Sequence, residues 1–175
     1  CRCFFIHMTA ASILFALSST ALVFSLPRRT AAVPLLLTGC FMTLGERMVI
    51  LGLDFTIFRI LVLAGWLRVL IRREAVFLKP HPMDRIMLVW AAVCIIFGVC
   101  LYQSFGGFTY NLGQSYNAVG LYFLFRIWIQ DFEGLRNILK HMAVMTAVLA
   151  GLIMIEWATG RNLFSIFGGV PEFTQ

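Results

Sequence analysis

Charged residues are absent from two long stretches of this chain. Residues 3–27 and 86–125 contain no Asp, Glu, Lys or Arg, whereas basic residues gather in short clusters such as Arg28-Arg29 and Arg72-Arg73. A charged side chain at the centre of a bilayer costs roughly 2.5–3.5 kcal/mol on insertion scales, so membrane-spanning segments exclude charge in this way. The pattern therefore predicts a helical membrane protein.

The composition agrees with this prediction. Hydrophobic residues make up 61% of the chain and charged residues 13%, whereas soluble domains are about 45–50% apolar. At ~20 residues for each span, a chain of 175 residues accommodates about six spans. We therefore expect an all-α, polytopic transmembrane helix bundle that forms one domain over residues 1–175. Because the chain starts at Cys1 and ends in a polar segment, we also expect it to be the N-terminal part of a longer protein.

The apolar runs predict the positions of the spans and their orientation. The expected spans cover residues 4–26, 31–48, 55–71, 86–103, 116–129 and 142–158, with a charge-free loop over residues 104–115. Alternating spans place ten Lys and Arg residues on one side and three on the other. Cytoplasmic loops of membrane proteins carry such an excess, so the side of Arg28-Arg29 is predicted to be cytoplasmic and the loop at 104–115 external.

The net charge of +6 does not indicate nucleic acid as a partner. The basic residues lie between apolar segments, and no basic groove interleaved with aromatic residues is visible. Membrane lipid is the expected partner, because clustered Lys and Arg beside a span are attracted to anionic headgroups.

Arg59 is the first candidate for a functional residue, because it lies inside the predicted third span. It could bind an anionic substrate such as a lipid-linked phosphate. Alternatively it is a structural arginine that pairs with Glu46 or Asp54, or that extends its guanidinium to the interface.

Two further charged residues lie near the ends of predicted spans. Arg126, beside Trp128, either contributes to a substrate site or reaches the cytoplasmic interface. Glu156, beside Trp157, either binds substrate, pairs with Arg161 or is an interfacial carboxylate. The aromatic and amide-rich segment 105–116 is compatible with a sugar-binding lip or with an aromatic belt at the membrane surface.

No metal or cofactor is expected from the sequence. The three histidines, at 7, 81 and 141, are isolated, and none has a second ligand at metal-binding spacing. The glycines follow no phosphate-loop pattern, and no Ser/His/Asp, HExxH or CxxC signature occurs.

Several segments together resemble the O-antigen ligase-like family, which includes polysaccharide polymerases. They are Asn117–Arg126 (NAVGLYFLFR), Glu156–Phe164 (EWATGRNLF), Gly168–Pro171 (GGVP) and Gly52–Arg59 (GLDFTIFR) with Trp66–Leu70 (WLRVL). The resemblance extends over about residues 35–175. It rests on the order and spacing of these segments rather than on any one of them.

The resemblance implies a glycosyltransferase of the GT-C type in the bacterial inner (cytoplasmic) membrane, with many spans. Members transfer or polymerise a glycan from an undecaprenyl-diphosphate carrier. It implies no catalytic residue within this chain, since the family's catalytic external loop would follow Gln175, and this part alone would be inactive. By resemblance, the substrate-binding candidates are Arg59, Arg126, Glu156, Arg161 and Asn162. The glycan and its acceptor are not indicated.

Two other classes of function remain open at this stage. A multi-pass transporter or flippase would have a similar pattern of spans, but it would usually show an internal repeat, and none is visible. A membrane subunit without activity of its own would retain Arg59 only as part of an ion pair.

Overall fold

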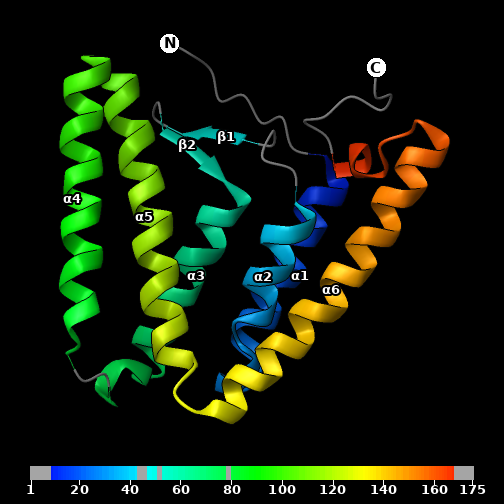
Figure 1. Cartoon of the computed structure of the whole chain (residues 1–175), viewed down its shortest axis with the longest axis horizontal. Helices are drawn as coiled ribbons and strands as arrows, with labels where there is room; N and C mark the ends of the chain where they lie inside the picture. Colours follow the sequence, from blue (N-terminus) through cyan, green and yellow to red (C-terminus); the bar gives the residue numbers. More distant parts are fainter. Residues whose placement is uncertain (1–8, 43–46, 51–52, 78–79, 168–175) are drawn as a thin grey trace.

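The computed structural model describes residues 9–42, 47–50, 53–77 and 80–167. Within these residues, six α-helices lie side by side and run alternately in opposite directions (Figure 1). The elements are α1 (Ala10–Ser25), η1 (Arg28–Thr30), α2 (Val33–Phe41), β1 (Arg47–Ile50), β2 (Leu53–Thr56), α3 (Ile57–Ile71), η2 (Glu74–Phe77), α4 (Pro82–Tyr102), α5 (Phe105–Trp128), α6 (Phe132–Thr159) and η3 (Leu163–Phe167).

The helix ends form two opposite sides of the bundle (Figure 1). The connections α1–α2, α3–α4 and α5–α6 share one side, which we call the basic side because Arg28-Arg29, Arg72-Arg73 and Arg126 belong to it. The opposite side carries the α4–α5 turn and an antiparallel hairpin in which Arg47 of β1 pairs with Thr56 of β2. We call it the hairpin side. The segments predicted to share one side of the membrane therefore lie together.

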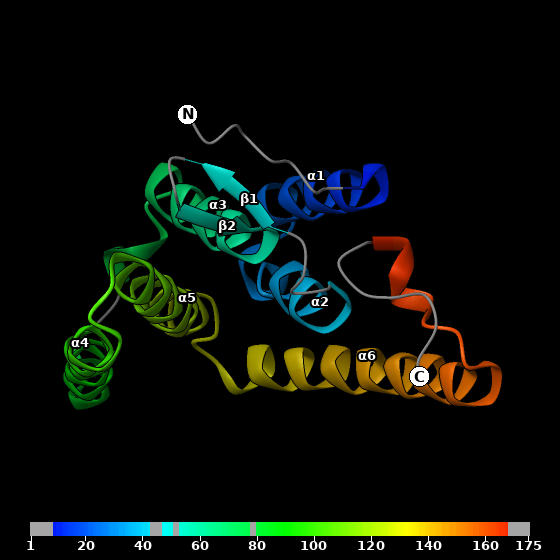
Figure 2. The same ribbon diagram turned by 90° about the horizontal axis from the view of Figure 1, so that it is seen from above.

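The core is formed by the middle helices. Helix α3 packs against α1, α2 and α5, while α4 packs against α5 and α6 against α2. Viewed from above, α4 and α6 lie at the margins (Figure 2). Fully buried side chains from four helices meet between them, namely Val23, Leu35, Leu61, Val62, Val69, Leu124, Ile127 and Trp128.

The predicted loop at 104–115 is wrong, because residues 105–115 form the first half of α5. Gln103, in the left-handed conformation with φ 42°, and Ser104 make up the whole turn after α4. The Ser104 hydroxyl accepts a hydrogen bond from Gly107 N at 3.1 Å and caps the helix. Glycine, asparagine and serine have low helix propensity, so tertiary packing must account for this half of α5.

Close helix contacts at glycine supply that packing. Added Cβ atoms would lie 2.4 Å from the Asn111 side chain at Gly98 and 2.6 Å from Val62 Cγ1 at Gly120. Helix α4 therefore approaches α5 over Gly98, and α3 approaches α5 over Gly120. Small residues allow helix backbones to come this close, as in membrane bundles.

The second predicted span is also wrong in its extent. Helix α2 ends at Phe41, and the chain is extended by Arg47; residues 43–46 lie outside the described part. Nine residues of α2 reach only about 14 Å at 1.5 Å per residue, less than half of a ~30 Å bilayer core. A helix that stops after nine residues cannot span the membrane alone.

Among the described residues, two helices rather than about six are long and apolar enough to cross a membrane, α4 and α6. Helix α1 is apolar but has 16 described residues, α3 has 15 residues and includes Arg59 and Arg68, and α5 is diluted by polar residues. The number of helices and their order agree with the prediction. The predicted number of spans does not, because most of the helices are too short or too polar to be identified as spans.

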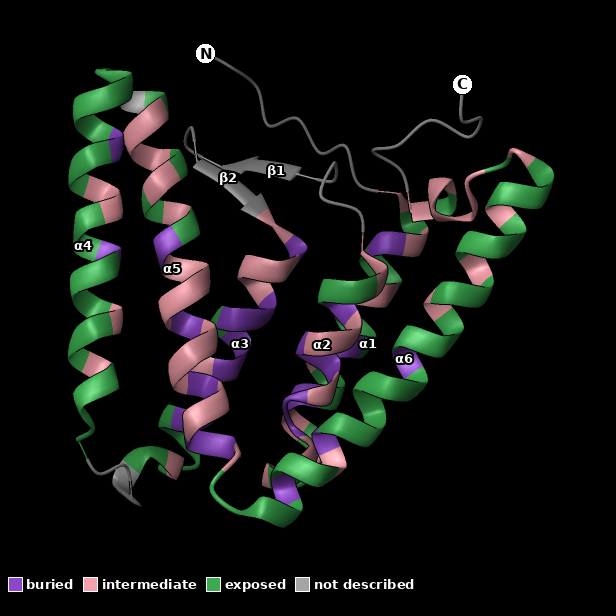
Figure 3. Ribbon diagram, in the orientation of Figure 1, coloured by how far each residue is buried: buried purple, intermediate pink, exposed green. Residues whose placement is uncertain are grey.

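Apolar side chains cover the outer faces of α4 and α6. Phe97 and Leu101 of α4 are 69% and 77% exposed, and Val144 and Met154 of α6 are 65% and 63% exposed. Figure 3 shows both helices as exposed over most of their length. An apolar surface of this extent is unusual for a soluble monomer and marks a surface that contacts lipid or another chain.

Replacing Gly120 by Ala should destabilise the bundle. The new methyl would meet Val62, which is buried and β-branched and cannot turn aside easily, so we expect a loss of about 1–3 kcal/mol. Gly151→Ala in α6, where nothing lies within 4 Å of an added Cβ, is the matched control and should leave stability unchanged or slightly higher. Thermal unfolding in detergent measures both; equal midpoints would contradict the close α3–α5 contact.

Candidate functional site

Arg59 lies in the first turn of α3, at the hairpin side. It is the third residue of the helix and is partly buried. Its guanidinium lies directly over Gly113 of α5, where an added Cβ would be 2.1 Å from Nη2. Any larger residue at 113 would displace the arginine. The predicted partners Glu46 and the Asp54 side chain lie outside the described part of the structure.

The backbone around Arg59 adds to its positive potential. Within the described part of the chain, Thr56 at the N-cap of α3 makes no side-chain capping bond. The first N–H groups of a helix have no partner inside it, and the helix dipole is positive at this end. A cation in the first turn opposes that dipole. The start of α3 thus combines a guanidinium with the positive end of a helix.

Arg126 lies at the other end of α5 and forms an ion pair. Its guanidinium contacts Asp84 Oδ1 of α4, and the Tyr122 hydroxyl donates to the same oxygen at 3.0 Å. The other carboxylate oxygen accepts from His81 N at 2.9 Å as part of a capping box at the start of α4. This cluster ties the N-terminus of α4 to the last turns of α5.

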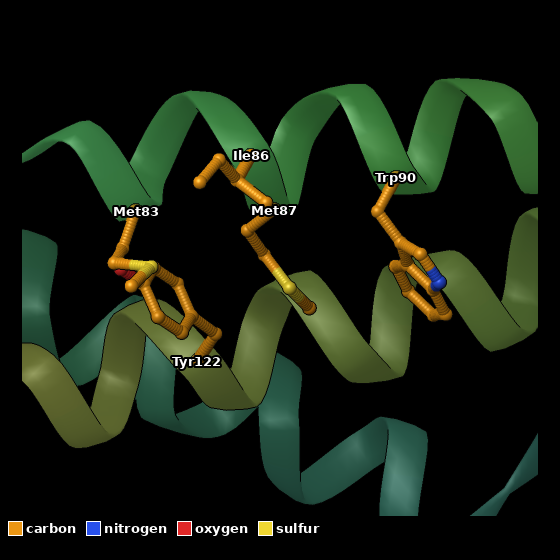
Figure 4. A pocket seen from close by; sticks show the side chains of 5 residues that line it. All are labelled: Met83, Ile86, Met87, Trp90 and Tyr122. Carbon is orange, nitrogen blue, oxygen red and sulfur yellow. The ribbon is translucent and has the colours of Figure 1, made fainter.

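An apolar groove of about 400 Å³ lies next to this pair. Met83, Met87 and Trp90 of α4 point toward α5, and Ile86 and Tyr122 complete the lining, with Tyr122 beside Met83 (Figure 4). The groove is open to the surroundings of the bundle, and its lining is almost wholly apolar. Met83 and Trp90 are 55% and 47% exposed.

The remaining predicted site residues lie at the hairpin end of α6. Glu156 is in the last turn of α6 and is partly exposed, with Trp157 beside it at 83% exposure. Arg161 is exposed in the following loop. Asn162 Oδ1 accepts a hydrogen bond from Phe164 N at 2.9 Å, so this side chain caps the start of η3.

η3 folds back onto the start of α1. The Thr9 hydroxyl donates to Phe167 O at 3.0 Å, and the Phe15 and Phe167 rings meet edge to face with centroids 5.6 Å apart. The segment after α6 is thereby held against α1. This placement brings Asn162 to the hairpin side but onto a different part of the bundle from Arg59.

The five predicted residues therefore occupy three places rather than one pocket. Arg59 contacts α5 at Gly113, and Arg126 is 13 residues further along the same helix, a separation of about 20 Å. Glu156, Arg161 and Asn162 belong to the far end of α6. Arg59 is the member that lies between packed helices at the side predicted to be external.

Arg68 was not among the predicted site residues, yet it is the fully buried cation of the described structure. It forms an ion pair with Glu74 Oε1 at 3.0 Å, and Glu74 Oε2 accepts from Trp128 Nε1 at 2.8 Å. The guanidinium carbon lies 5.7 Å from the Trp128 ring centre. One buried arginine thus joins the ends of α3 and α5 to η2.

Arginines also bond the last carbonyl groups of two helices. Arg68 donates to Val23 O and, at 2.8 Å, to Leu26 O, and Arg72 donates to Phe24 O at 2.6 Å, all at the C-terminus of α1. Arg28 Nε donates to Ile127 O at 3.0 Å, at the end of α5. Helix C-termini carry unsatisfied carbonyls and partial negative charge, which cations stabilise.

The sequence signal for this arrangement was the position of the basic clusters. Each cluster follows an apolar run. Basic residues that set the orientation of a membrane protein occupy the same positions, so the pattern fits both roles. Sequence alone could not show that the arginines turn back onto helix ends. Among the described residues, no group of three or more His, Cys, Asp or Glu lies close enough together to hold a metal ion.

Replacing Arg68 by Leu should destabilise the bundle strongly. The change leaves Glu74 buried beside Trp128 without its cation and leaves the α1 carbonyls unsatisfied, so we expect a loss of about 3–5 kcal/mol. The matched control is Arg85→Leu, because Arg85 is exposed and should tolerate the change. The thermal midpoint in detergent is the measurement. If Arg68→Leu unfolds at the same temperature as Arg85→Leu, the buried network does not hold the basic side together.

No family model, no curated protein and no solved structure matches this chain. Its function is therefore inferred from its own residues and their arrangement.

Proposed function

We propose that this chain is a multi-pass protein of the bacterial inner membrane with its basic side in the cytoplasm. Two described helices are long and apolar enough to cross a bilayer, and the exposed faces of both are apolar. The basic clusters gather on one side of the helices (Figure 1). In lipid, exposed apolar faces are solvated by acyl chains, and an excess of Lys and Arg keeps one side in the cytoplasm.

We further propose that the protein takes part in the biosynthesis of cell-envelope polysaccharide. The proposed activity is transfer or polymerisation of a glycan carried on undecaprenyl diphosphate, as in the O-antigen ligase-like family that the sequence resembles. In this reaction an acceptor hydroxyl attacks the anomeric carbon. The bond to the diphosphate breaks, and undecaprenyl diphosphate leaves with its electron pair.

The observation that carries the proposal is Arg59 at the start of α3. Its guanidinium and the positive end of the helix point to an anion on the hairpin side, which is the external side in the proposed topology. A cation in the first helical turn does not favour the helix itself. An arginine binds a phosphate oxygen pair in two parallel hydrogen bonds, which suits a diphosphate.

Arg59 would act on the carrier rather than on the sugar. A cation held next to a diphosphate stabilises the charge that develops as the glycosidic bond breaks. Gly113 leaves the space in which the guanidinium lies. No residue of this chain is proposed as the base that takes the acceptor's proton, and none is assigned as a nucleophile.

A membrane subunit without activity of its own is the second candidate. It is favoured by the pairing of Arg126 with Asp84 and of Arg68 with Glu74, because both arginines then serve the structure of the bundle. Under this alternative, changing Arg59 would affect assembly and leave chemistry to a partner. A transporter lacks a comparable observation in its favour.

The proposed topology predicts opposite accessibility for the two ends of α5. In a variant without its native cysteines, Gln103→Cys should react with an impermeant maleimide in intact cells. Phe132→Cys, which is 92% exposed just beyond the other end, should react only after lysis. The 24 residues of α5 extend about 36 Å, enough to separate the two compartments. Equal labelling of both positions in intact cells would contradict a spanning α5.

Replacing Arg59 by Ala in the intact protein should reduce glycan transfer at least about 100-fold, because the leaving diphosphate loses its cation. Arg59→Lys should retain part of the activity. Arg85→Ala, which removes an exposed cation on the basic side, is the matched control. Transfer is measured as the surface-glycan ladder, and membrane insertion as the amount of protein in washed membranes. A normal ladder from inserted Arg59→Ala protein would rule out this role.

A further inference from the structure

Four exposed cations on the basic side, Arg73, Arg85, Arg136 and Lys140, have no ion pair or side-chain hydrogen bond among the described residues, and two of them, Arg136 and Lys140, lie on one helix. Arg28, Arg68 and Arg72 bond helix carbonyls, and Arg29 and Arg126 pair with carboxylates. Arg136 and Lys140 of α6 are exposed, and neither forms an ion pair or side-chain hydrogen bond with the residues that the structure describes. Their charge is therefore available to a ligand.

The nearby carboxylates do not neutralise these two cations. Asp131 and Glu133, at the start of α6, both face Arg29 of η1, with N–O distances of 3.6 and 3.0 Å. Both carboxylates thus face Arg29, and no described ion pair joins either of them to Arg136 or Lys140. Arg136 and Lys140, four residues apart, lie one above the other on the same face of α6.

The same face of α6 is apolar on either side of the two cations. Phe132, Leu135 and Leu139 are 92%, 42% and 55% exposed. Together with Ala143 and the two cations they line an open groove of about 470 Å³. Figure 3 shows α6 exposed over most of its length.

The face continues into small residues toward the hairpin side. Ala143 and Ala147 are exposed, and nothing lies within 4 Å of a Cβ added at Gly151. A stripe of exposed small side chains therefore extends from the groove along the helix. An extended acyl chain can lie along such a stripe, because it needs apolar contact and no hydrogen bonds.

We propose that this face of α6 binds a phospholipid with an anionic headgroup, such as phosphatidylglycerol. The phosphate lies between Arg136 and Lys140, and one acyl chain follows Leu139 and Ala143 toward Gly151. The inference rests on the membrane placement given under the proposed function. Charge complementarity selects the headgroup, and the exposed apolar residues select a lipid over a soluble phosphate, which would leave them in water.

Lipid binding by the whole chain tests the proposal. The protein is first reconstituted into vesicles of phosphatidylcholine and phosphatidylglycerol and checked by flotation. Native mass spectrometry in detergent then gives apparent dissociation constants for phosphatidylglycerol, phosphatidylcholine and inorganic phosphate. The test variant is Arg136→Gln with Lys140→Gln. The control is Arg73→Gln with Arg85→Gln, which removes two exposed cations from other segments of the basic side.

We expect phosphatidylglycerol to bind more tightly than phosphatidylcholine and inorganic phosphate not to bind. One basic residue near an anionic headgroup contributes about fivefold, so the test variant should weaken phosphatidylglycerol binding about 30-fold. The control should change it less than about threefold. Exchanging the two side chains, as Arg136→Lys with Lys140→Arg, should restore binding, because both charges return.

Three results would overturn the proposal. Equal binding of the two lipids would show that charge does not select the headgroup. Equal weakening in the test and control variants would assign the effect to net charge rather than to this groove. Failure of the wild-type protein to float with vesicles would overturn the membrane placement as well, whereas flotation without a preference for phosphatidylglycerol overturns the lipid site alone.

Discussion

The buried Arg68–Glu74 ion pair is the interaction on which the arrangement of the helices depends. Burying an arginine costs several kcal/mol unless its donors are satisfied. Here the Glu74 carboxylate of η2 and two carbonyls at the end of α1 accept hydrogen bonds from the Arg68 guanidinium. The Trp128 ring of α5 packs against this guanidinium, and its Nε1 donates to the Glu74 carboxylate. Four elements therefore meet at one cation, and none of them can move away without leaving a buried polar group unsatisfied.

This connection makes the two sides of the bundle chemically different. On the basic side, arginines neutralise the carbonyl ends of α1 and α5 and join neighbouring helices. On the hairpin side, Arg59 stands at the positive end of α3 and lies over Gly113 of α5. The first arrangement places cations at helix C-termini, which stabilises the fold, whereas the second places a cation at a helix N-terminus, which does not. This contrast is why the proposed function is placed at the hairpin side.

The helices of the chain could be located from the sequence because charge-free apolar runs leave few alternatives. The breaks at Arg28-Arg29, at 72–85 and at 130–141 each contain a real connection, but residues 82–85 belong to α4 and residues 132–141 to α6. The segment 104–115 could not be predicted correctly, because Gly107, Asn111 and Gly113 indicate a loop by local propensity. They become helical since Gly98 and Arg59 on neighbouring helices pack against them. Likewise, no local pattern shows that Arg126 pairs with Asp84, which is 42 residues away.

The sequence by itself determined that this is a chain of apolar helices with most of its basic residues toward one side, because charge-free segments and basic clusters can be read directly from composition and spacing. The tertiary structure decided which arginines are used within the fold and which remain available. That distinction separates Arg68 from Arg136 and Lys140, and it depends on which helix ends and carboxylates come within hydrogen-bond distance. Such distances are set by packing between segments far apart in the chain, and they cannot be predicted from the local sequence pattern.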